Sequence, residues 1–173
     1  MFVKIGRGSD GKKPILGVIL QRYAQARMGR TFSHRIRIRY AECDPQGVVF
    51  NANYYAYFDL LITELWREAI GGYNAMLDAG ADLSVVESRA RFVAPARFDD
   101  EVDLKATIAR LGNTAMSTRI DITRSDDGGT LVEGEIHHVF IDPATYTKRP
   151  IPDDVRAALE PYLRDAVEEP TPQ

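Results

Sequence analysis

The sequence predicts an α+β fold in which a five-stranded, mostly antiparallel sheet wraps around one long central helix. Three observations predict it. One helical segment is apolar around most of its circumference, five segments have the composition of strands, and the last four strands are joined largely by turns too short for a crossover. With 173 residues, 45% of them hydrophobic, the chain has the size and composition of one soluble domain.

The first strand is predicted over residues 34–42, where charged and apolar side chains alternate. A period of two residues is typical of a strand with one face in solvent and the other in the core. We therefore interpret the charged face as a solvated surface. The alternating residues are Arg35, Arg37 and Arg39 on one face and Ile36, Ile38 and Tyr40 on the other.

The central helix is predicted over residues 52–70, with Asn51 or Asn53 as its N-cap. Its apolar residues cover well over half of the helical circumference, whereas a surface helix shows only an apolar stripe. The helix should therefore be enclosed on several sides. Gly71-Gly72 ends it, because glycine readily adopts the left-handed conformation that terminates helices. The apolar residues are Tyr54, Tyr55, Tyr57, Phe58, Leu60, Leu61, Ile62, Leu65, Trp66, Ala69 and Ile70.

Four more strands and a short helix follow. Gly112-Asn113 and the run 126–129 are typical of tight turns between antiparallel strands. Pro95 closes the second strand, and Pro143 follows the last one. The predicted strands are residues 83–94, 101–110, 114–124 and 130–142, and the predicted amphipathic helix is residues 153–166.

Charge divides the chain into three parts. Residues 1–30 hold seven Lys or Arg against one acidic residue, although the whole chain has a net charge of −3. We expect residues 1–30 to be a basic extension, helical or disordered, residues 31–166 to be the folded domain and residues 167–173 to be a C-terminal tail. The extension is open to four interpretations: a docking helix over 14–28, a targeting or membrane-surface segment, a solvated tail, or a stretch upstream of a true start at Met28.

Composition argues against several classes of protein. A single cysteine, Cys43, excludes an internal disulfide framework and a cysteine-rich zinc site, and three histidines argue against a histidine-rich metal site. The small net negative charge does not indicate a nucleic-acid partner. No apolar run reaches the ~18–20 residues needed to span a bilayer. We expect a cytoplasmic protein with no nucleic-acid partner and no membrane span.

Asp44 is the residue that most clearly indicates chemistry. It lies in the turn 44–47 between the first strand and the helix, so its carboxylate is near the free N–H groups at about 50–53. These groups and the helix dipole favour negative charge, which develops on the carbonyl oxygen when a thioester is attacked. Asp44 would act either as a nucleophile or as a general base toward water, and sequence does not separate the two. The same segment also has the composition of a simple turn.

Three motifs, in order along the chain, carry a family resemblance. They are residues 43–50 (CDPQGVVF), residues 95–101 (PARFDDE), and residues 138–142 (HVFID) together with 148–152 (KRPIP). With this order of elements, the chain resembles the hotdog-fold acyl-CoA thioesterases, and in particular their 4-hydroxybenzoyl-CoA thioesterase branch. The resemblance covers residues 34 to about 160.

The resemblance implies a hotdog fold and a homodimer, in some members a homotetramer, with sheets joined edge to edge and active sites at the interface. It implies that acyl-CoA is the substrate, that Asp44 is the catalytic carboxylate, and that no metal or cofactor is needed. Many members of the wider family carry a histidine where this chain has Asn51, so we expect the backbone N–H of Asn51 to polarise the carbonyl. The residues expected to contact substrate are Gly47, Val48, Val49, Phe50 and Tyr54 near the thioester, and Arg89, Arg91 and Arg110 near the phosphates of CoA.

Other functions stay open. The turn beside Arg110 is less basic than is usual in the family, which leaves an acyl-carrier-protein thioester as an alternative substrate. A non-catalytic acyl-CoA-binding hotdog protein is a second alternative. A hotdog dehydratase or hydratase is a third, but it would need a histidine directly before the helix. Cys43 could be a thiol nucleophile with His34 as its base, although we expect it to be a small packing residue.

Overall fold

The structure of the protein, a computed structural model, describes residues 29–164. Most of the predicted basic extension, including the helix over 14–28, and the predicted tail over 167–173 therefore lie outside the described residues.

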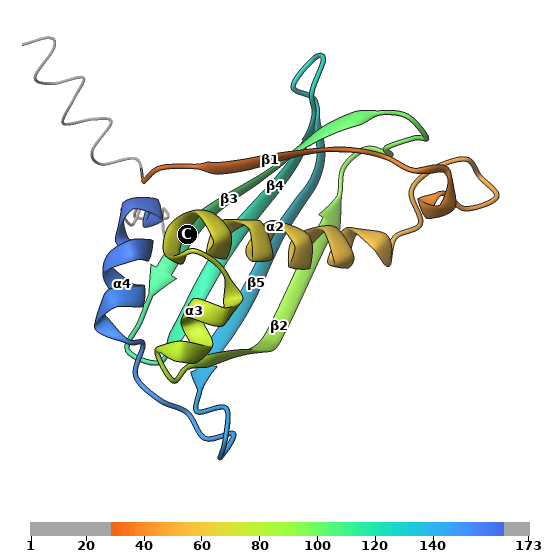
Figure 1. The fold of residues 1–173 in the computed structure, drawn as a ribbon. Coiled ribbons are helices and arrows are strands. Elements are labelled where there is room, and N and C mark those ends of the chain that lie inside the picture. The colour runs from red at the N-terminus through yellow and green to blue at the C-terminus, as the bar shows by residue number, and fades with distance from the viewer. Residues whose placement is uncertain (1–28, 165–173) are drawn as a thin grey trace, which may run out of the picture.

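A five-stranded antiparallel sheet forms one layer of the domain (Figure 1). Its spatial order is β1-β3-β4-β5-β2, so the strand that follows the long helix pairs at the far edge, beside the last strand. Every pairing is antiparallel, which confirms the predicted sheet. The strands are β1 (Phe32–Arg37), β2 (Asp82–Phe92), β3 (Glu101–Leu111), β4 (Ala115–Arg124) and β5 (Thr130–Ile141).

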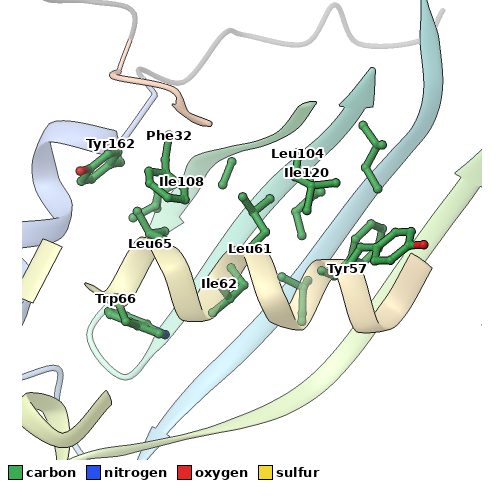
Figure 2. Close-up of a cluster of buried hydrophobic side chains, with 14 of the residues drawn as sticks. Phe32, Tyr57, Leu61, Ile62, Leu65, Trp66, Leu104, Ile108, Ile120 and Tyr162 are labelled. Carbon is green, nitrogen blue, oxygen red and sulfur yellow. The ribbon is translucent and has the colours of Figure 1, made fainter. Parts of the chain in front are cut away.

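The long helix α2 (Asn53–Ile70) lies across one face of this sheet, as predicted (Figure 1). Figure 2 shows Leu61 pointing from α2 toward Leu104 of β3 and Ile120 of β4. All three side chains are fully buried, so the interface between helix and sheet is the core of the domain. None of the helices in residues 29–164 has the length and apolarity needed to cross a membrane. The buried residues of α2 are Tyr54, Tyr57, Phe58, Leu61, Ile62, Leu65 and Trp66.

Two short helices lie near the C-terminal end of α2 (Figure 1). The helix α3 (Tyr73–Asp78) was not predicted, because it has no capping side chain and depends on the burial of Met76 in the core. The helix α4 (Asp153–Leu159) is shorter than predicted. It gives way to a 3-10 turn, η2 (Glu160–Tyr162), because Pro161 has no N–H to donate and its ring disfavours a continued α-helix.

The first strand is also shorter than predicted. β1 ends at Arg37, and the chain soon turns into a short 3-10 helix, η1 (Tyr40–Glu42). The backbone N–H of Arg39 donates to Oε2 of Glu42 at 2.7 Å, and the Arg39 guanidinium donates to Oε1 at 2.6 and 2.9 Å. These local bonds favour a turn, even though the alternation of charged and apolar residues continues through Tyr40.

The two ends of the described range lie side by side, next to the C-terminal end of α2. The backbone N–H of Arg30 donates to the carbonyl oxygen of Pro161 at 2.8 Å. The hydroxyl of Tyr162 donates to the carboxylate of Glu68 on α2 at 3.1 Å, and Arg30 forms an ion pair with the same carboxylate. The first and last described residues are therefore fastened to each other and to the helix.

The strand β2 forms a free edge of the sheet in a single chain, because it pairs only with β5. Beside a bulge in this strand, Val85 and Val86 are 56% and 61% exposed. An edge with unpaired backbone groups and apolar side chains is a template for pairing with another strand.

Candidate active site

Asp44 lies in a hydrogen-bonded turn at the N-terminal end of α2. The backbone N–H of Gly47 donates to the Asp44 carbonyl oxygen at 2.9 Å, and the N–H of Gln46 donates to Oδ1 of Asp44 at 2.8 Å. Gly47 has φ +73°, a conformation that favours glycine. The segment is thus the simple turn that its composition indicates, and one oxygen of the carboxylate is held by the backbone while Oδ2 has no partner within the described residues.

The residues after this turn run back against the segment that precedes β3. The backbone N–H of Val49 donates to the carbonyl oxygen of Ala96 at 2.9 Å, and Val48 forms an isolated bridge with Arg97. Cys43 forms a similar bridge with Val49. The Cys43 side chain packs against the core, which agrees with the packing role expected for it.

The start of α2 differs from the prediction. Its N-cap is Ala52, and no side chain caps the helix. Asn53 donates instead from Nδ2 to the carbonyl oxygen of Glu42 at 2.7 Å, and this carbonyl also accepts the Phe50 N–H at 2.9 Å. The Asn53 N–H donates to the carbonyl of Phe50. Of the N–H groups expected over 50–53, only those of Asn51 and Ala52 have no acceptor among residues 29–164.

One cavity of about 350 Å³ brings the turn and the helix start together. This volume is in the range of small-molecule sites. Six of the residues predicted at the site line it, but Gly47 does not. The end of β2 supplies a wall that was missed, and the apolar run before Pro95 was the available signal. The predicted lining residues are Asp44, Val48, Val49, Phe50, Asn51 and Tyr54, and the additional ones are Phe92, Val93, Ala94 and Pro95.

Tyr54 is the buried aromatic wall of this cavity. Its hydroxyl accepts the backbone N–H of Ala96 at 3.3 Å, and its ring lies 5.4 Å from that of Phe92. Burial raises the pKa of the Tyr54 hydroxyl, so the side chain is neutral at physiological pH. The cavity therefore combines one carboxylate, a residue with a free backbone N–H, Asn51, and apolar walls, while Ala52 is the next residue along the chain and does not line the cavity.

The three arginines predicted to contact CoA do not line this cavity. Arg89 is paired with Glu87 at 2.7 Å, and Arg91 is paired with Glu133 at 2.8 Å, both on the outer face of the sheet. Arg110 lines a second cavity, of about 410 Å³, near the turn between β3 and β4. Their contact with phosphates remains a prediction.

The described residues do not assemble a metal centre. No group of three or more His, Cys, Asp or Glu within 29–164 is placed to hold an ion. His137 and His138 diverge, as expected for neighbours on a strand. His137 accepts or donates a hydrogen bond with Ser117 at 2.7 Å, whereas His138 is buried.

Comparison with known proteins identifies the family. The family model described as the Thioesterase superfamily matches residues 46–131, which include the cavity residues from Val48 to Pro95. The chain belongs to the thioesterase superfamily. This membership confirms the family that the motifs indicate.

Among relatives in the thioesterase superfamily, the chain is 26% identical over 129 residues to the acyl-CoA thioester hydrolase YbgC of Escherichia coli, covering 75% of this chain and 96% of that protein. It is 24% identical over 111 residues to the 4-hydroxybenzoyl-CoA thioesterase of Pseudomonas sp. strain CBS-3, covering 59% of this chain and 74% of that protein. The crystal structure of the hypothetical protein TT1821 from Thermus thermophilus superposes with a TM-score of 0.69 at 30% identity, over 77% of this chain and 98% of that one. The hotdog fold is thereby confirmed.

Proposed function

We propose that this chain hydrolyses acyl-CoA thioesters to a carboxylic acid and free CoA, with Asp44 as the reacting carboxylate. The observation that carries the proposal is that Asp44 and Asn51 line the same apolar cavity. The names of the relatives, an acyl-CoA thioester hydrolase and a 4-hydroxybenzoyl-CoA thioesterase, support the substrate class.

The chemistry requires a carbonyl carbon next to Asp44 and a carbonyl oxygen next to the helix start. In one route a carboxylate oxygen of Asp44 bonds to the carbonyl carbon, the C–S bond breaks, and water hydrolyses the resulting mixed anhydride. In the other, Asp44 takes a proton from the water whose oxygen attacks the carbonyl carbon, the C–S bond breaks, and Asp44 returns the proton to the leaving sulfur, which departs as the CoA thiol. In both routes the free N–H of Asn51, which lines the cavity, stabilises the developing oxyanion, and one such donor is typically worth about 10²–10³ in rate.

The free edge of the sheet supports a homodimer. Phe92 and Val93 line the cavity and also lie at the end of β2, where they are 48% and 49% exposed. A second copy paired along β2 would cover them and extend the sheet. Because the pairing would be antiparallel, it would place the Asp44 cavity of one protomer toward the Arg110 cavity of the other, where Arg110 can meet the phosphates of CoA.

The test is steady-state hydrolysis of a panel of acyl-CoAs, from short and long aliphatic to benzoyl and phenylacetyl esters, followed by release of free thiol. Asp44→Asn should lower kcat by about 10³-fold or more, while the affinity for a non-hydrolysable thioether analogue of the best substrate stays within a few-fold. Asp127→Asn is the matched control, because Asp127 also accepts a backbone N–H two residues ahead, at 2.7 Å, in a turn, and does not line the cavity.

The outcomes separate the alternatives. Turnover that survives in Asp44→Asn would refute the assigned role of Asp44. A folded wild-type protein that hydrolyses no acyl-CoA would redirect the assay to acyl-carrier-protein thioesters. Tight binding of acyl-CoA without any turnover would indicate a binding protein.

A further inference from the structure

Glu42 has a buried carboxylate that does not line the Asp44 cavity, and both of its carboxylate oxygens accept hydrogen bonds. The residue is 9% exposed, and its carboxylate receives three hydrogen bonds from Arg39, one from the backbone N–H and two from the guanidinium, at 2.6–2.9 Å. Burial by itself raises the pKa of this carboxyl, but the hydrogen bonds and charge of Arg39, together with the neighbouring Tyr57 hydroxyl, outweigh burial and lower the pKa below its ordinary value. Glu42 is therefore a fixed anion that closes the η1 turn.

The backbone of the same residue holds the start of α2. The carbonyl oxygen of Glu42 accepts the Phe50 N–H at 2.9 Å and the side-chain amide of Asn53 at 2.7 Å. These two donors flank the two residues that have free N–H groups, Asn51 and Ala52. The position of the Glu42 carbonyl therefore determines where the free N–H groups lie.

Glu42 also precedes the reacting carboxylate by two residues. A displacement of the η1 turn would move Asp44 on one side and the Asn51 and Ala52 donors on the other. The Tyr57 hydroxyl is buried beside the Glu42 carboxylate, in a geometry short of a standard hydrogen bond. Both residues line a separate cavity of about 600 Å³, so the bonds from Arg39, rather than close packing, hold the carboxylate in place.

We propose that Glu42 is a positioning residue of the thioester site, because its side chain fixes the η1 turn and its carbonyl fixes the backbone donors at the start of α2. The proposal rests on the proposed function, and it adds a residue that contacts neither the substrate nor the cavity. A misplacement of about 1 Å at a reacting group can cost on the order of 10² in rate.

The test compares Glu42→Ala and Glu42→Gln with a matched control. Glutamine keeps an acceptor for the Arg39 guanidinium but loses the charge. The Glu42→Gln variant should therefore retain more of the wild-type kcat than the Glu42→Ala variant. Asp103→Asn is the control, because Asp103 is another partly buried carboxylate held by two bonds from an arginine, at 2.7 and 3.1 Å from Arg35, on the outer face of the sheet. We expect kcat to fall about 10²-fold in Glu42→Ala and about tenfold in Glu42→Gln, with KM changed less than threefold and Asp103→Asn unchanged.

A second measurement does not depend on turnover. Amide hydrogen exchange over residues 49–55, followed by mass spectrometry, should accelerate at least tenfold in Glu42→Ala and stay at the wild-type rate in Asp103→Asn. If the wild type hydrolyses no thioester, the proposed function fails. The exchange rates over residues 49–55 then decide by themselves whether Glu42 fixes the start of α2. Unchanged exchange, or a loss of stability equal to that of Asp103→Asn with normal kcat, would overturn the positioning role.

Discussion

Gly134 of β5 lies directly under the ring of Phe58 from α2. A Cβ atom added at position 134 would lie 2.8 Å from Cε2 of Phe58 and closer still to Cζ, whereas real Cβ contacts are longer than 3.0 Å. Phe58 is fully buried, so its ring has no free space into which to move. The absence of a side chain on β5 therefore allows the helix to approach the sheet in its N-terminal half.

Gly134→Ala should accordingly destabilise the fold by about 1–3 kcal/mol, because it overpacks a filled core. Urea unfolding at neutral pH measures the change. Phe58→Leu shortens the ring side chain and should recover part of the loss in the Gly134→Ala background. A double-mutant cycle with no coupling between the two positions would show that the crowding is relieved elsewhere.

Gly47→Ala should reduce both stability and turnover. Gly47 has φ +73° and an open surrounding, so alanine meets only the backbone strain of the left-handed conformation, about 1–2 kcal/mol. Because the Asp44 turn would relax to relieve that strain, we expect kcat to fall about tenfold. Gly128→Ala provides the control, since Gly128 has φ +71° with nothing near its Cβ position but lies in the hairpin before β5. Equal effects of the two variants on kcat would contradict a role for the Gly47 turn.

His138 should make the fold less stable in acid. Burial, assisted by the neighbouring His137, lowers the pKa of His138 from 6.5 to about 4. Between these pH values His138 is protonated in the unfolded chain but stays neutral in the folded chain. The free energy of unfolding therefore falls as the pH drops from about 6.5 to about 4, and His138 does not change it above that window. The loss is on the order of 3 kcal/mol. Urea unfolding at pH 4 and pH 7 gives the stability that each protein loses in acid. His138→Gln should lose less stability than the wild type, and equal losses in the two proteins would exclude His138 as the cause.

The fold could be predicted because its main elements follow from local patterns. Apolar residues around most of the circumference of α2 predict that this helix is buried on several sides. The alternating segments joined by tight turns predict antiparallel strands. The failures occur where a specific contact overrides the periodic pattern, a tertiary contact in one case and a local bond in the other. The helix α3 depends on the burial of Met76, and β1 ends early because Glu42 binds the backbone of Arg39.

The candidate site could be predicted only in part, for the same reason. Asp44, Asn51 and Tyr54 occupy one short stretch, so a single motif identifies them. The wall formed by Phe92 and Val93 comes from the far edge of the sheet, and only the pairing order places it beside the helix start. The N-cap assignment was wrong because Asn53 has a tertiary partner, the Glu42 carbonyl, that no local pattern reveals.

The bond from Arg30 to Pro161 has a practical consequence for handling the protein. It places both described ends by Glu68, near the C-terminal end of α2, while the Asp44 turn lies at the opposite end of that helix (Figure 1). A resin or sensor chip attached directly at either end of the 29–164 range would be joined to the side of the domain away from the cavity. For the same reason the 29–164 domain suits circular permutation, since a short linker could join its ends and new termini could be opened in the hairpin at Gly128.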